Sequence, residues 1–488
     1  MRAAELFCGF DTPTLPETEL LTLTENASIA NESAVFVCIR GARHDGHRFA
    51  PDAYRNGCRF FVAEEPPNLP PDACVVLCKN TKEALGQLAC RFYGDPSHRM
   101  HLIGITGTKG KTTTAVLLAH ILNTCGIPCG YIGTNGVRFR NHQYATKNTT
   151  PDSITLQKTL CEMQAAGVFT AVIEVSSQAL LCHRTAGMHF ETVLFTNLSP
   201  DHIGESEHPD FENYKACKMR LFTEFGAKTA IINADDGIAQ EVLTMALSDR
   251  KITVSTRENA NFFASEIRTS KAARTLGVAF TASGGGIQTP VALPLIGKMN
   301  VQNALMAMAV ANTCFDIPLP TAANALQSAS VDGRSEVFAL SSGASVIIDY
   351  AHNGTSLYHL LTTLREYEPN RLIVLFGSVG ERTKQRRHEL GAVAAELCDL
   401  CILTSDNPGK EDPDAIIADI AKAFEGKKTP YLAIPDRREA IRTAVDLTQA
   451  GDILVLAGKG HENYQLIGNE KIPFSEREIL AGVIRELV

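Results

Sequence analysis

The sequence predicts an α/β protein of three domains, and three features of the chain support this prediction. Short apolar runs bounded by turn residues alternate with amphipathic stretches along almost the whole length, as strands alternating with helices do. The 488 residues exceed what a single hydrophobic core usually serves, so several domains are expected. The composition, 44% hydrophobic and 20% charged, is that of a folded globular protein.

The first domain is predicted for residues 1–98. Its apolar runs at 34–39 and 60–63 are expected to be strands, and the stretch 81–93 has the pattern of a helix. The segment 94–100 contains a glycine and a proline and is expected to be a linker.

The second domain is predicted for residues 99–330 and opens with the strand His-Leu-Ile-Gly-Ile-Thr. Further strands are expected at 172–175, 193–197 and 229–233. The part from 252 to 296 is richer in threonine, serine and glycine and is expected to be an antiparallel excursion. A long helix is expected over 297–314.

The third domain is predicted for residues 331–488, where four apolar runs are separated by helical segments. The runs lie at 345–352, 371–378, 400–406 and 452–460. This is the pattern of a doubly wound parallel sheet, whose ligands bind at the carboxyl ends of the strands. Functional side chains are therefore expected directly after each strand.

Charge and cysteine usage limit the classes of function. A net charge of −8 argues against a general nucleic-acid-binding protein. No apolar stretch reaches the roughly 18 residues of a membrane helix, and residues 1–8 lack a secretory apolar core. Fourteen cysteines without an export signal are expected to be reduced thiols, which indicates the cytoplasm. Core packing is favoured over metal or redox chemistry for the only Cys-x-x-Cys motif, Cys398 and Cys401.

A glycine-rich loop with phosphate-binding character follows the first strand of the second domain. It comprises Gly107, Thr108, Lys109, Gly110, Lys111, Thr112, Thr113 and Thr114. Glycines let backbone N–H groups surround a polyphosphate at a helix N-terminus. Lys111 would reach the β- and γ-phosphates, and the Thr112 hydroxyl would ligate Mg²⁺. Ile105 stands where the common spacing has glycine, but the strand–loop–helix context favours a nucleotide site over an ordinary turn.

Motifs in all three domains resemble those of the Mur ligases, in the family's order. After the loop come NTTPD (148–152), EVSSQAL (174–180), TNLSPDH (196–202) and YKACK (214–218). The MurE type is indicated by GARHDGHRFAPDA (41–53), DYAH (349–352), SDNP (405–408) and AGKGHE (457–462).

This resemblance implies a UDP-binding N-terminal domain, a central P-loop ATPase domain and a Rossmann-like C-terminal domain. It also implies the reaction. ATP phosphorylates a carboxylate of UDP-N-acetylmuramoyl-L-alanyl-D-glutamate, and the amine of an amino acid attacks the acyl phosphate, giving the tripeptide, ADP and phosphate. The expected partners are these small molecules and Mg²⁺, with no nucleic acid and no membrane span, and a monomer is expected.

The reaction brings two anions together, so positive charge must lie between them, and Mg²⁺ with hard oxygen ligands supplies it. By resemblance, Glu174 and His202 are expected to be metal ligands beside Thr112 of the loop, and Lys218 is expected to carry an Nζ-carbamate that binds the second Mg²⁺. Lys215, three residues earlier, competes for that role. The expected catalytic residues are Lys111, His202 and Lys218.

Other contacts are implied by the same resemblance. The predicted contacts to the UDP-muramoyl dipeptide are Thr149, Thr150, Ser176 and Arg184. The predicted nucleotide contacts beyond the loop are Asn300, Arg334, Asp349 and His352. An arginine can grip a carboxylate or pyrophosphate with two parallel hydrogen bonds. The usual Asp-Ser-Arg of the uridine region is replaced by Asn26-Ala27-Ser28, so the uracil contacts are not carried over.

The residues that hold the incoming amino acid depart from one branch of the family. Asp406, Asn407, Gly458 and Glu462 are expected to hold the amino acid, with Arg382 as a further contact. Diaminopimelate-adding enzymes of this type have Asp-Asn-Pro-Arg, whose arginine grips the distal carboxylate. This chain has Gly409 at the arginine position, and Lys410 is a poor substitute because it offers only a point charge.

The amino acid is therefore predicted to be L-lysine, and the DYAHNG sequence at 349–354 also resembles the lysine-adding branch. L-ornithine, or another residue without a distal carboxylate, is the next choice. meso-Diaminopimelate also stays an alternative, because Arg382 or Arg386 could supply a replacement grip on its distal carboxylate.

Two other functions compete with this prediction. One is another amide ligase of the superfamily, such as a folylpolyglutamate synthase or a secondary-metabolite enzyme, but the UDP-type N-terminal domain and the Asp-Asn-Pro motif argue against the folate branch. The other is a P-loop ATPase without ligase activity, which would leave Glu174, His202 and Lys218 without a role.

Overall fold

The computed structural model describes the chain apart from residues 13–14, 42–43, 202, 205–206, 258, 273–274, 333–335, 382, 461 and 487–488. The described residues form two compact units. The first unit comprises Met1–Phe263 with Leu305–Pro318, and the second comprises Ala264–Ala304 with Leu319–Val488. None of the described helices has the length and apolar character that a membrane-spanning segment requires.

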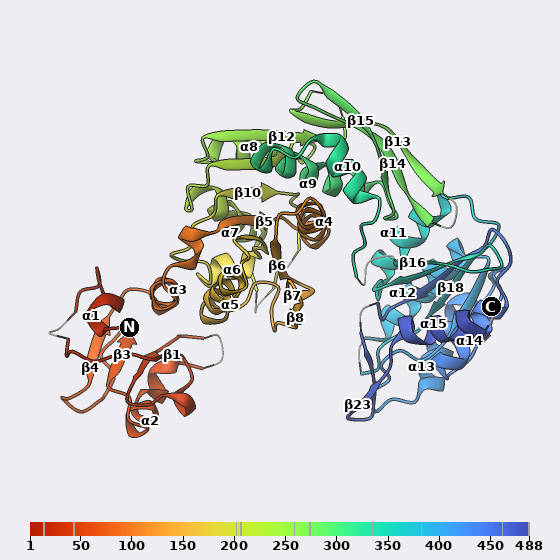
Figure 1. Cartoon of the computed structure of the whole chain (residues 1–488). Helices are drawn as coiled ribbons and strands as arrows, with labels where there is room; N and C mark the ends of the chain where they lie inside the picture. The colour runs from red at the N-terminus through yellow and green to blue at the C-terminus, as the bar shows by residue number, and fades with distance from the viewer. Residues whose placement is uncertain are drawn as a thin grey trace. The chain divides into compact units, whose positions relative to one another are not determined.

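The first unit begins with a small parallel sheet in the order β1-β2-β3-β4 (Figure 1). Its strands are β1 (Thr22–Thr24), β2 (Ala34–Val37), β3 (Phe60–Ala63) and β4 (Cys74–Leu77), and its helices are α1 (Ala3–Leu6), α2 (Ala50–Arg55) and α3 (Thr81–Phe92). Successive residues of a strand point to opposite faces. Accordingly Val35 and Val37 pack with α3, whereas Phe36 packs with α2. The predicted strands and the predicted helix of this domain are confirmed.

The main sheet of the first unit has the order β12-β11-β10-β5-β9-β6-β7-β8. Its strands are β5 (His101–Thr106), β6 (Cys129–Gly133), β7 (Gly136–Phe139), β8 (His142–Tyr144), β9 (Thr170–Glu174), β10 (Thr192–Phe195), β11 (Thr229–Asn233) and β12 (Arg250–Ser255). Its helices are α4 (Lys111–Thr124), α5 (Ser153–Ala165), α6 (Ser177–Leu181), α7 (Phe211–Thr223) and α8 (Ala239–Met245). The pairings from β12 to β6 are parallel, and β7 and β8 add an antiparallel edge.

The predicted antiparallel excursion begins later than expected. Residues 250–255 form β12, which pairs in parallel with β11, so the prediction was wrong for this strand. The helix α8 carries the chain from β11 to β12, and such a crossover produces a parallel pair. β13 (Phe262–Ala272) also begins in parallel with β12, and the antiparallel pair consists of β14 (Thr275–Gly284) and β15 (Ile287–Leu293). The helix predicted next is present as α9 (Met299–Phe315), followed by α10 (Leu319–Leu326).

The second unit contains a sheet in the order β16-β17-β21-β18-β19-β20, parallel except for β16. The strands are β16 (Glu336–Ala339), β17 (Ser345–Asp349), β18 (Leu372–Phe376), β19 (Leu400–Leu403), β20 (Tyr431–Ala433) and β21 (Ile453–Ala457). The helices are α11 (Gly354–Arg365), α12 (Lys384–Leu397), α13 (Pro413–Ala421), α14 (Arg437–Asp446) and α15 (Glu476–Glu486). A hairpin of β22 (Tyr464–Ile467) and β23 (Glu470–Pro473) precedes α15.

This sheet is covered by helices on both faces, which confirms the doubly wound prediction. Ile347 and Val374 pack with α11, α12 and α13, whereas their neighbours Val346 and Ile373 pack with α14 and α15. Both faces of the central strands are therefore buried, which explains their nearly continuous apolar sequence. Cys398 and Cys401 lie in the first of these cores, 4% and 0% exposed, in agreement with the predicted packing role.

Candidate active site

The loop between β5 and α4 folds around two glycines. Gly107 (φ +145°) and Gly110 (φ +85°) adopt backbone conformations that other residues rarely take. A Cβ atom at Gly107 would also collide with the hydroxyl of Thr196. Only glycine fits at this position. The loop then runs directly into the N-terminus of α4, where backbone N–H groups and the helix dipole favour a bound phosphate.

The segment after β10 holds this loop in shape. The Asn197 carbonyl accepts a hydrogen bond from the Thr108 N–H (2.8 Å), and the Asn197 side chain accepts one from the Lys109 N–H (2.8 Å). The Thr196 hydroxyl donates to the Lys109 carbonyl (2.7 Å), and the Thr108 hydroxyl donates to the Ser199 carbonyl (3.1 Å). The Thr-Asn-Leu-Ser motif found in the sequence therefore shapes the phosphate loop.

Lys111 begins α4, and its ammonium group turns back over the loop. It donates to the carbonyls of Gly107 (2.8 Å) and Thr108 (3.0 Å). Thr112 and Thr113 follow in the first helical turn, Thr112 being buried. The cation thus lies beside the backbone that would surround a polyphosphate.

Glu174, the last residue of β9, is fully buried beside the loop. Its Oε2 accepts a hydrogen bond from the Thr112 hydroxyl (2.8 Å). Its Oε1 accepts from the Tyr131 hydroxyl (2.6 Å) and the Thr134 N–H (2.9 Å). Burial, followed by the Glu174 charge, raises the pKa of Tyr131, so this hydroxyl stays a donor. The absence of a side chain at Gly133 makes room for the carboxylate.

The Thr112 hydroxyl and the Glu174 carboxylate are hard oxygen donors at the edge of the phosphate loop. Mg²⁺ is usually bound by one or two carboxylates together with substrate phosphates, so this pair fits that ion. His202, the other predicted ligand, lies outside the described residues. Tyr131 and Thr134 were missed by the sequence interpretation, because nothing in their local pattern indicates that they bond to a carboxylate 40 or more residues away.

Lys218 lies on the inner face of α7 and is 3% exposed. Its Nζ donates to the Gly107 carbonyl (2.8 Å) and lies 4.5 Å from the centre of the Tyr214 ring. Burial, followed by the charge of Lys111, lowers the pKa of Lys218 well below its usual value. Lys215 instead forms ion pairs with Glu212 and Glu241, both at 3.2 Å.

The four predicted dipeptide contacts cluster around the end of β9. The Thr150 hydroxyl donates to the Glu174 carbonyl (2.7 Å) and lies 3.3 Å from the Ser176 hydroxyl. Arg184 donates to the Thr150 carbonyl (2.9 Å), and the Thr149 hydroxyl lies 3.2 Å from that of Thr134. The structure therefore brings these residues together with the Glu174 centre.

A pocket of about 660 Å³ lies in the N-terminal part of the first unit. It is lined by Glu25, Asn26, Ala27, Ser28, Ile39, Gly41, His44, Gly46, Phe49, Asp52 and Asn56. Burial and then the charge of Asp152 raise the pKa of Glu25, whereas Arg184 and Lys147 oppose that shift. Glu25 is thus electrostatically coupled to the neighbourhood of the Thr150 cluster. The Asn26-Ala27-Ser28 segment, whose role the sequence left open, forms part of the pocket wall.

In the second unit, the Asp-Tyr-Ala-His motif follows β17. The Asp349 side chain accepts from the Ala351 N–H (2.9 Å), and the Asp349 carbonyl accepts from the Gly458 N–H (3.2 Å). His352 Nδ1 lies 2.9 Å from the Tyr350 carbonyl. The motif thus meets the loop after the neighbouring strand β21.

Asn300 also belongs to the second unit, near the start of α9. Its side chain bonds to the Ile296 carbonyl (2.8 Å) and to Asn303 (3.0 Å). Arg334 lies outside the described residues, so its predicted nucleotide contact has no structural description.

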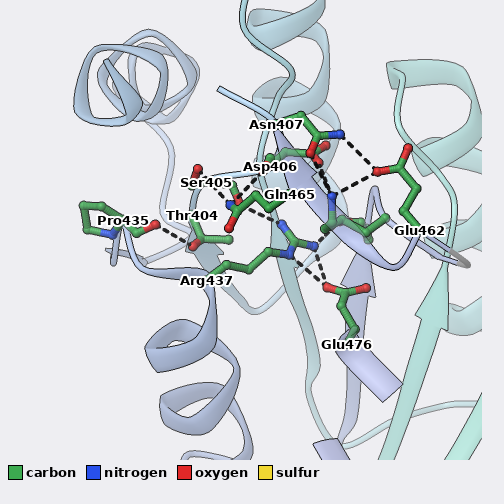
Figure 2. Close-up of polar contacts among 11 residues, drawn as sticks. Thr404, Ser405, Asp406, Asn407, Pro435, Arg437, Glu462, Gln465 and Glu476 are labelled. Carbon is green, nitrogen blue, oxygen red and sulfur yellow. Dashed lines mark hydrogen bonds and ion pairs between the residues drawn. The ribbon is translucent and has the colours of Figure 1, made fainter. Parts of the chain in front are cut away.

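The residues predicted to hold the incoming amino acid meet around Lys459, to which the sequence interpretation gave no role. Lys459 is fully buried, and its Nζ donates to Asn407 Oδ1 (3.0 Å) and Glu462 Oε2 (3.0 Å) and lies 3.5 Å from Asp406 Oδ1. The Asn407 amide also donates to Glu462 (3.0 Å; Figure 2). Gly458, with φ +111°, lets the chain turn between β21 and this lysine. Arg382 lies outside the described residues.

Models of Mur ligase domains match most of the chain. Residues 28–93 match the family model "Mur ligase family, catalytic domain". Residues 105–311 match "Mur ligase middle domain", and residues 333–460 match "Mur ligase, glutamate ligase domain".

The chain belongs to the Mur ligase family.

Relatives of known name agree with this assignment. The Mur ligase is 37% identical, over 93% of both chains, to UDP-N-acetylmuramoyl-L-alanyl-D-glutamate--2,6-diaminopimelate ligase of Clostridium botulinum. It is 37% identical to the ligase of the same name from Bacillus cereus, over 98% of this chain and 97% of that one. A solved structure of a ligase of this name has a TM-score of 0.78 at 28% identity and covers 100% of this chain and 99% of its own.

The three-domain Mur ligase architecture predicted from the sequence is confirmed, and the protein is an ATP-dependent amide-bond-forming ligase. The exact boundaries at 98 and 330 stay predictions. Within this Mur ligase, the phosphate loop, Glu174, Lys218 and the Thr150 cluster lie together in the first unit. Asp406, Asn407 and Glu462 lie together in the second.

At Gly409 of the Mur ligase, the backbone conformation itself favours glycine over a residue with a side chain. Its φ of +60° is unfavourable for other residues, and a Cβ atom there would lie 2.7 Å from Glu381 Oε2. Its N–H donates to the Leu466 carbonyl (3.1 Å) on the β22–β23 hairpin. The backbone here is thus adapted to glycine, with a carboxylate beside it.

Proposed function

We propose that this Mur ligase adds the third residue of the peptidoglycan stem peptide to UDP-N-acetylmuramoyl-L-alanyl-D-glutamate. The observation that carries the proposal is the direct contact between the phosphate-loop residue Thr112 and Glu174, which is joined through Thr150 to Ser176 and Arg184. This chain of contacts places a polyphosphate site next to groups suited to an anionic peptide. The names of the relatives, all ligases acting on this UDP-dipeptide, support the same substrate.

Thr112 and Glu174 would hold Mg²⁺, which supplies positive charge between the γ-phosphate and the substrate carboxylate. Lys111 would neutralise charge on the transferring phosphate, since a fixed cation stabilises the charge that develops there. Arg184 would grip a carboxylate or pyrophosphate group of the UDP-dipeptide with its guanidinium fork. Glu174 is shielded from water, which strengthens these interactions.

Lys218 is proposed to carry the carbamate. Carbamate formation needs a neutral amine, whose nitrogen attacks the carbon of CO₂ while one proton leaves. The buried position of Lys218 and its lowered pKa favour that neutral form. The product is an oxygen anion at the inner face of α7, available to a second Mg²⁺. Lys215 is less suitable, because its carboxylate partners raise its pKa and keep it charged.

The 660 Å³ pocket is proposed to receive the uridine end of the substrate. Its volume is within the range of small-molecule sites, and its polar residues Asn26, Ser28 and Asn56 can hydrogen-bond to uracil or ribose.

Asn300, Arg334, Asp349 and His352 stay predicted nucleotide contacts. All fourteen cysteines are free, as is usual in a reducing compartment, so we propose that the reaction takes place in the cytoplasm. A monomer stays an expectation.

The third residue is proposed to be a diamino acid, with L-lysine preferred. Asp406 and Glu462 bring two negative charges around the single charge of Lys459, so a further ammonium group suits the site. Gly409 provides no guanidinium for a distal carboxylate, and Glu381 Oε2 would repel one. meso-Diaminopimelate is the second candidate, because the named relatives use it.

Phosphate release tests the reaction. We expect release from ATP to require both UDP-N-acetylmuramoyl-L-alanyl-D-glutamate and an amino acid. Release with ATP alone would indicate an ATPase, and acceptance of a folate in place of the UDP-dipeptide would indicate the folylpolyglutamate branch.

The amino acid is decided by kcat/KM for L-lysine and for meso-diaminopimelate under identical conditions, with L-ornithine as a third substrate. We expect L-lysine to be preferred. A tenfold preference for diaminopimelate, about 1.4 kcal/mol in transition-state binding, would overturn this choice.

A further inference from the structure

Arg437, the first residue of α14, is a buried arginine that sequence motifs did not single out. It is 1% exposed, and its guanidinium bonds to groups from three separate segments of the chain. Nε and Nη2 donate to Glu476 Oε1 (2.9 and 2.8 Å) at the start of α15. Nη1 donates to the Ser405 carbonyl (3.2 Å; Figure 2). Nη2 also donates to the Ala457 carbonyl (2.8 Å).

The two carbonyls belong to the chain directly before the amino-acid site. Ser405 precedes Asp406 at the carboxyl end of β19, and Ala457 ends β21, two residues before Lys459. β18 lies between these two strands in the sheet, so no backbone ladder joins β19 to β21 directly. The guanidinium fork spans that gap, because its five N–H groups have a fixed planar arrangement.

Glu476 is the ion-pair partner of Arg437 and, in the described part of the chain, forms no hydrogen bond or ion pair with Asp406, Asn407, Lys459 or Glu462 of the amino-acid site. The side chain is 1% exposed; its Oε1 accepts from Arg437, whereas Oε2 has no hydrogen-bond partner among the described residues. Burial raises the pKa of Glu476, and Arg437 opposes that shift. A buried ion pair of this kind is weak evidence for a stabilising role, since replacement by apolar residues is often neutral. The two bonds to strand-end carbonyls therefore point to a positional role.

Neighbouring contacts hold the same strand end from its other side. The Gln465 amide on β22 donates to the Asp406 carbonyl (2.7 Å) and lies 3.2 Å from the Ser405 hydroxyl. The Thr404 hydroxyl and the Ser405 N–H both donate to the Pro435 carbonyl, two residues before Arg437. Asp406 is thus enclosed between the hairpin and the start of α14, and Arg437 bonds to the backbone carbonyls of both strand ends.

We propose that Arg437 and Glu476 form a positioning pair for the amino-acid substrate, setting the spacing between Asp406 on one strand end and Lys459 with Glu462 on the other. The proposal rests on the proposed function, because the amino-acid site is part of it. Arg437 itself has no contact with substrate in this role. Its fork fixes two backbone segments, and their side chains receive the amino acid.

The test measures KM separately for the amino acid, ATP and the UDP-dipeptide in full-length variants. Arg437→Lys keeps the charge but cannot bridge three acceptors, so KM for the amino acid is expected to rise about tenfold, with the other two KM values within about twofold. The matched control is Arg442→Lys, which changes an exposed ion pair with Glu486 (3.0 Å) between the same two helices and is expected to leave every KM unchanged.

A double variant, Arg437→Met with Glu476→Leu, distinguishes a role in positioning the amino-acid site from a role in the stability of the fold. It removes both buried charges, so it is expected to fold with a Tm close to that of the wild type, yet to retain the raised KM for the amino acid. A wild-type KM for the amino acid in either Arg437 variant, or equal rises in all three KM values, would overturn the positioning role. If the wild-type enzyme needs no amino acid for phosphate release, the proposed function itself fails, which is a different result.

Discussion

At the scale of single residues, three lysines near the glycine-rich loop have different surroundings and are expected to have different roles. Lys111 lies over the phosphate loop, and Lys218 lies behind it, bonded to Gly107. Lys215 is on the same helix as Lys218 but pairs with two glutamates. Spacing alone left Lys215 and Lys218 as competitors, and burial separates them.

Lys111→Ala is expected to reduce kcat by more than tenfold, at least about 1.4 kcal/mol, because it removes the cation beside the transferring phosphate. The Tm is expected to change little, since the Lys111 ammonium donates to carbonyls of its own loop and is only partly buried. The measurement is phosphate release together with thermal unfolding. Activity above about a tenth of the wild-type value would contradict the assignment of the loop.

Lys218→Ala is expected to abolish activity, and added bicarbonate is not expected to restore it, because no amine remains to form the carbamate. A small carboxylic acid is expected to restore part of the activity by supplying an oxygen ligand for the metal. The control is Lys215→Ala, which breaks only partly exposed ion pairs and is expected to stay active. An active, Mg²⁺-bound crystal structure with an unmodified Lys218 would rule out the carbamate.

At the scale of elements, Arg387 ties α12 to α13 and to the loop that contains Gly409. It is 1% exposed and bonds to both carboxylate oxygens of Glu411 (2.8 and 2.6 Å) and to Asp419 (3.0 Å). Arg387 lowers the pKa of Glu411 to about 2, and Lys422 followed by Arg387 lowers that of Asp419 to about 2. A carboxyl group with a lowered pKa stabilises the fold above its usual pKa, and this contribution disappears as the pH falls toward 2.

Arg387→Met is therefore expected to lower stability at pH 7 by about 1 kcal/mol, a modest loss because both carboxylates stay partly exposed to water. The loss is expected to shrink as the pH falls from about 4.5 toward 3, where the wild type loses the same contribution. Urea unfolding at several pH values measures this. The control is Lys384→Met, which removes an exposed partner of Asp419 at 3.6 Å and is expected to change stability little. A loss of stability in Arg387→Met that does not depend on pH would contradict the ion-pair explanation.

At the scale of the whole molecule, stability comes from several apolar cores. The first unit has cores around its two sheets, and the second has one core on each face of its sheet. The residues that would hold Mg²⁺, Thr112 and Glu174, lie at strand and helix ends beside these cores. The metal is thus expected to serve catalysis and ATP binding rather than folding.

Removal of Mg²⁺ with a chelator is expected to stop phosphate release and to leave the Tm of the ligand-free protein unchanged. ATP with Mg²⁺ at about a hundred times its Kd is expected to add roughly 2.7 kcal/mol of stability by mass action, and the chelator is expected to remove most of that gain. Thermal unfolding with and without ATP measures both effects. A lower Tm after chelation in the absence of ATP would show that the metal is structural.

Local patterns determined much of this protein. The alternation of apolar runs and amphipathic stretches predicted an α/β fold, because strand and helix periodicities are properties of neighbouring residues. The phosphate loop was visible for the same reason, since glycine torsion angles and a helix N-terminus need only a few consecutive residues. The strand β12 was misjudged because composition does not distinguish a parallel from an antiparallel partner, which the crossover helix decides.

Contacts across the chain were decided only by the tertiary structure. The sequence identified Glu174, but its partners Tyr131 and Thr134 come from a different strand and turn. Lys459 lies inside the AGKGHE motif but was given no role, and Arg437 lies in none of the motifs found in the sequence. The importance of both follows from contacts with strand ends 20 to 53 residues away. Sequence determines which groups are available and where each strand stops. Packing alone determines which of those strand ends meet, because burial and hydrogen bonding depend on neighbours that are distant along the chain.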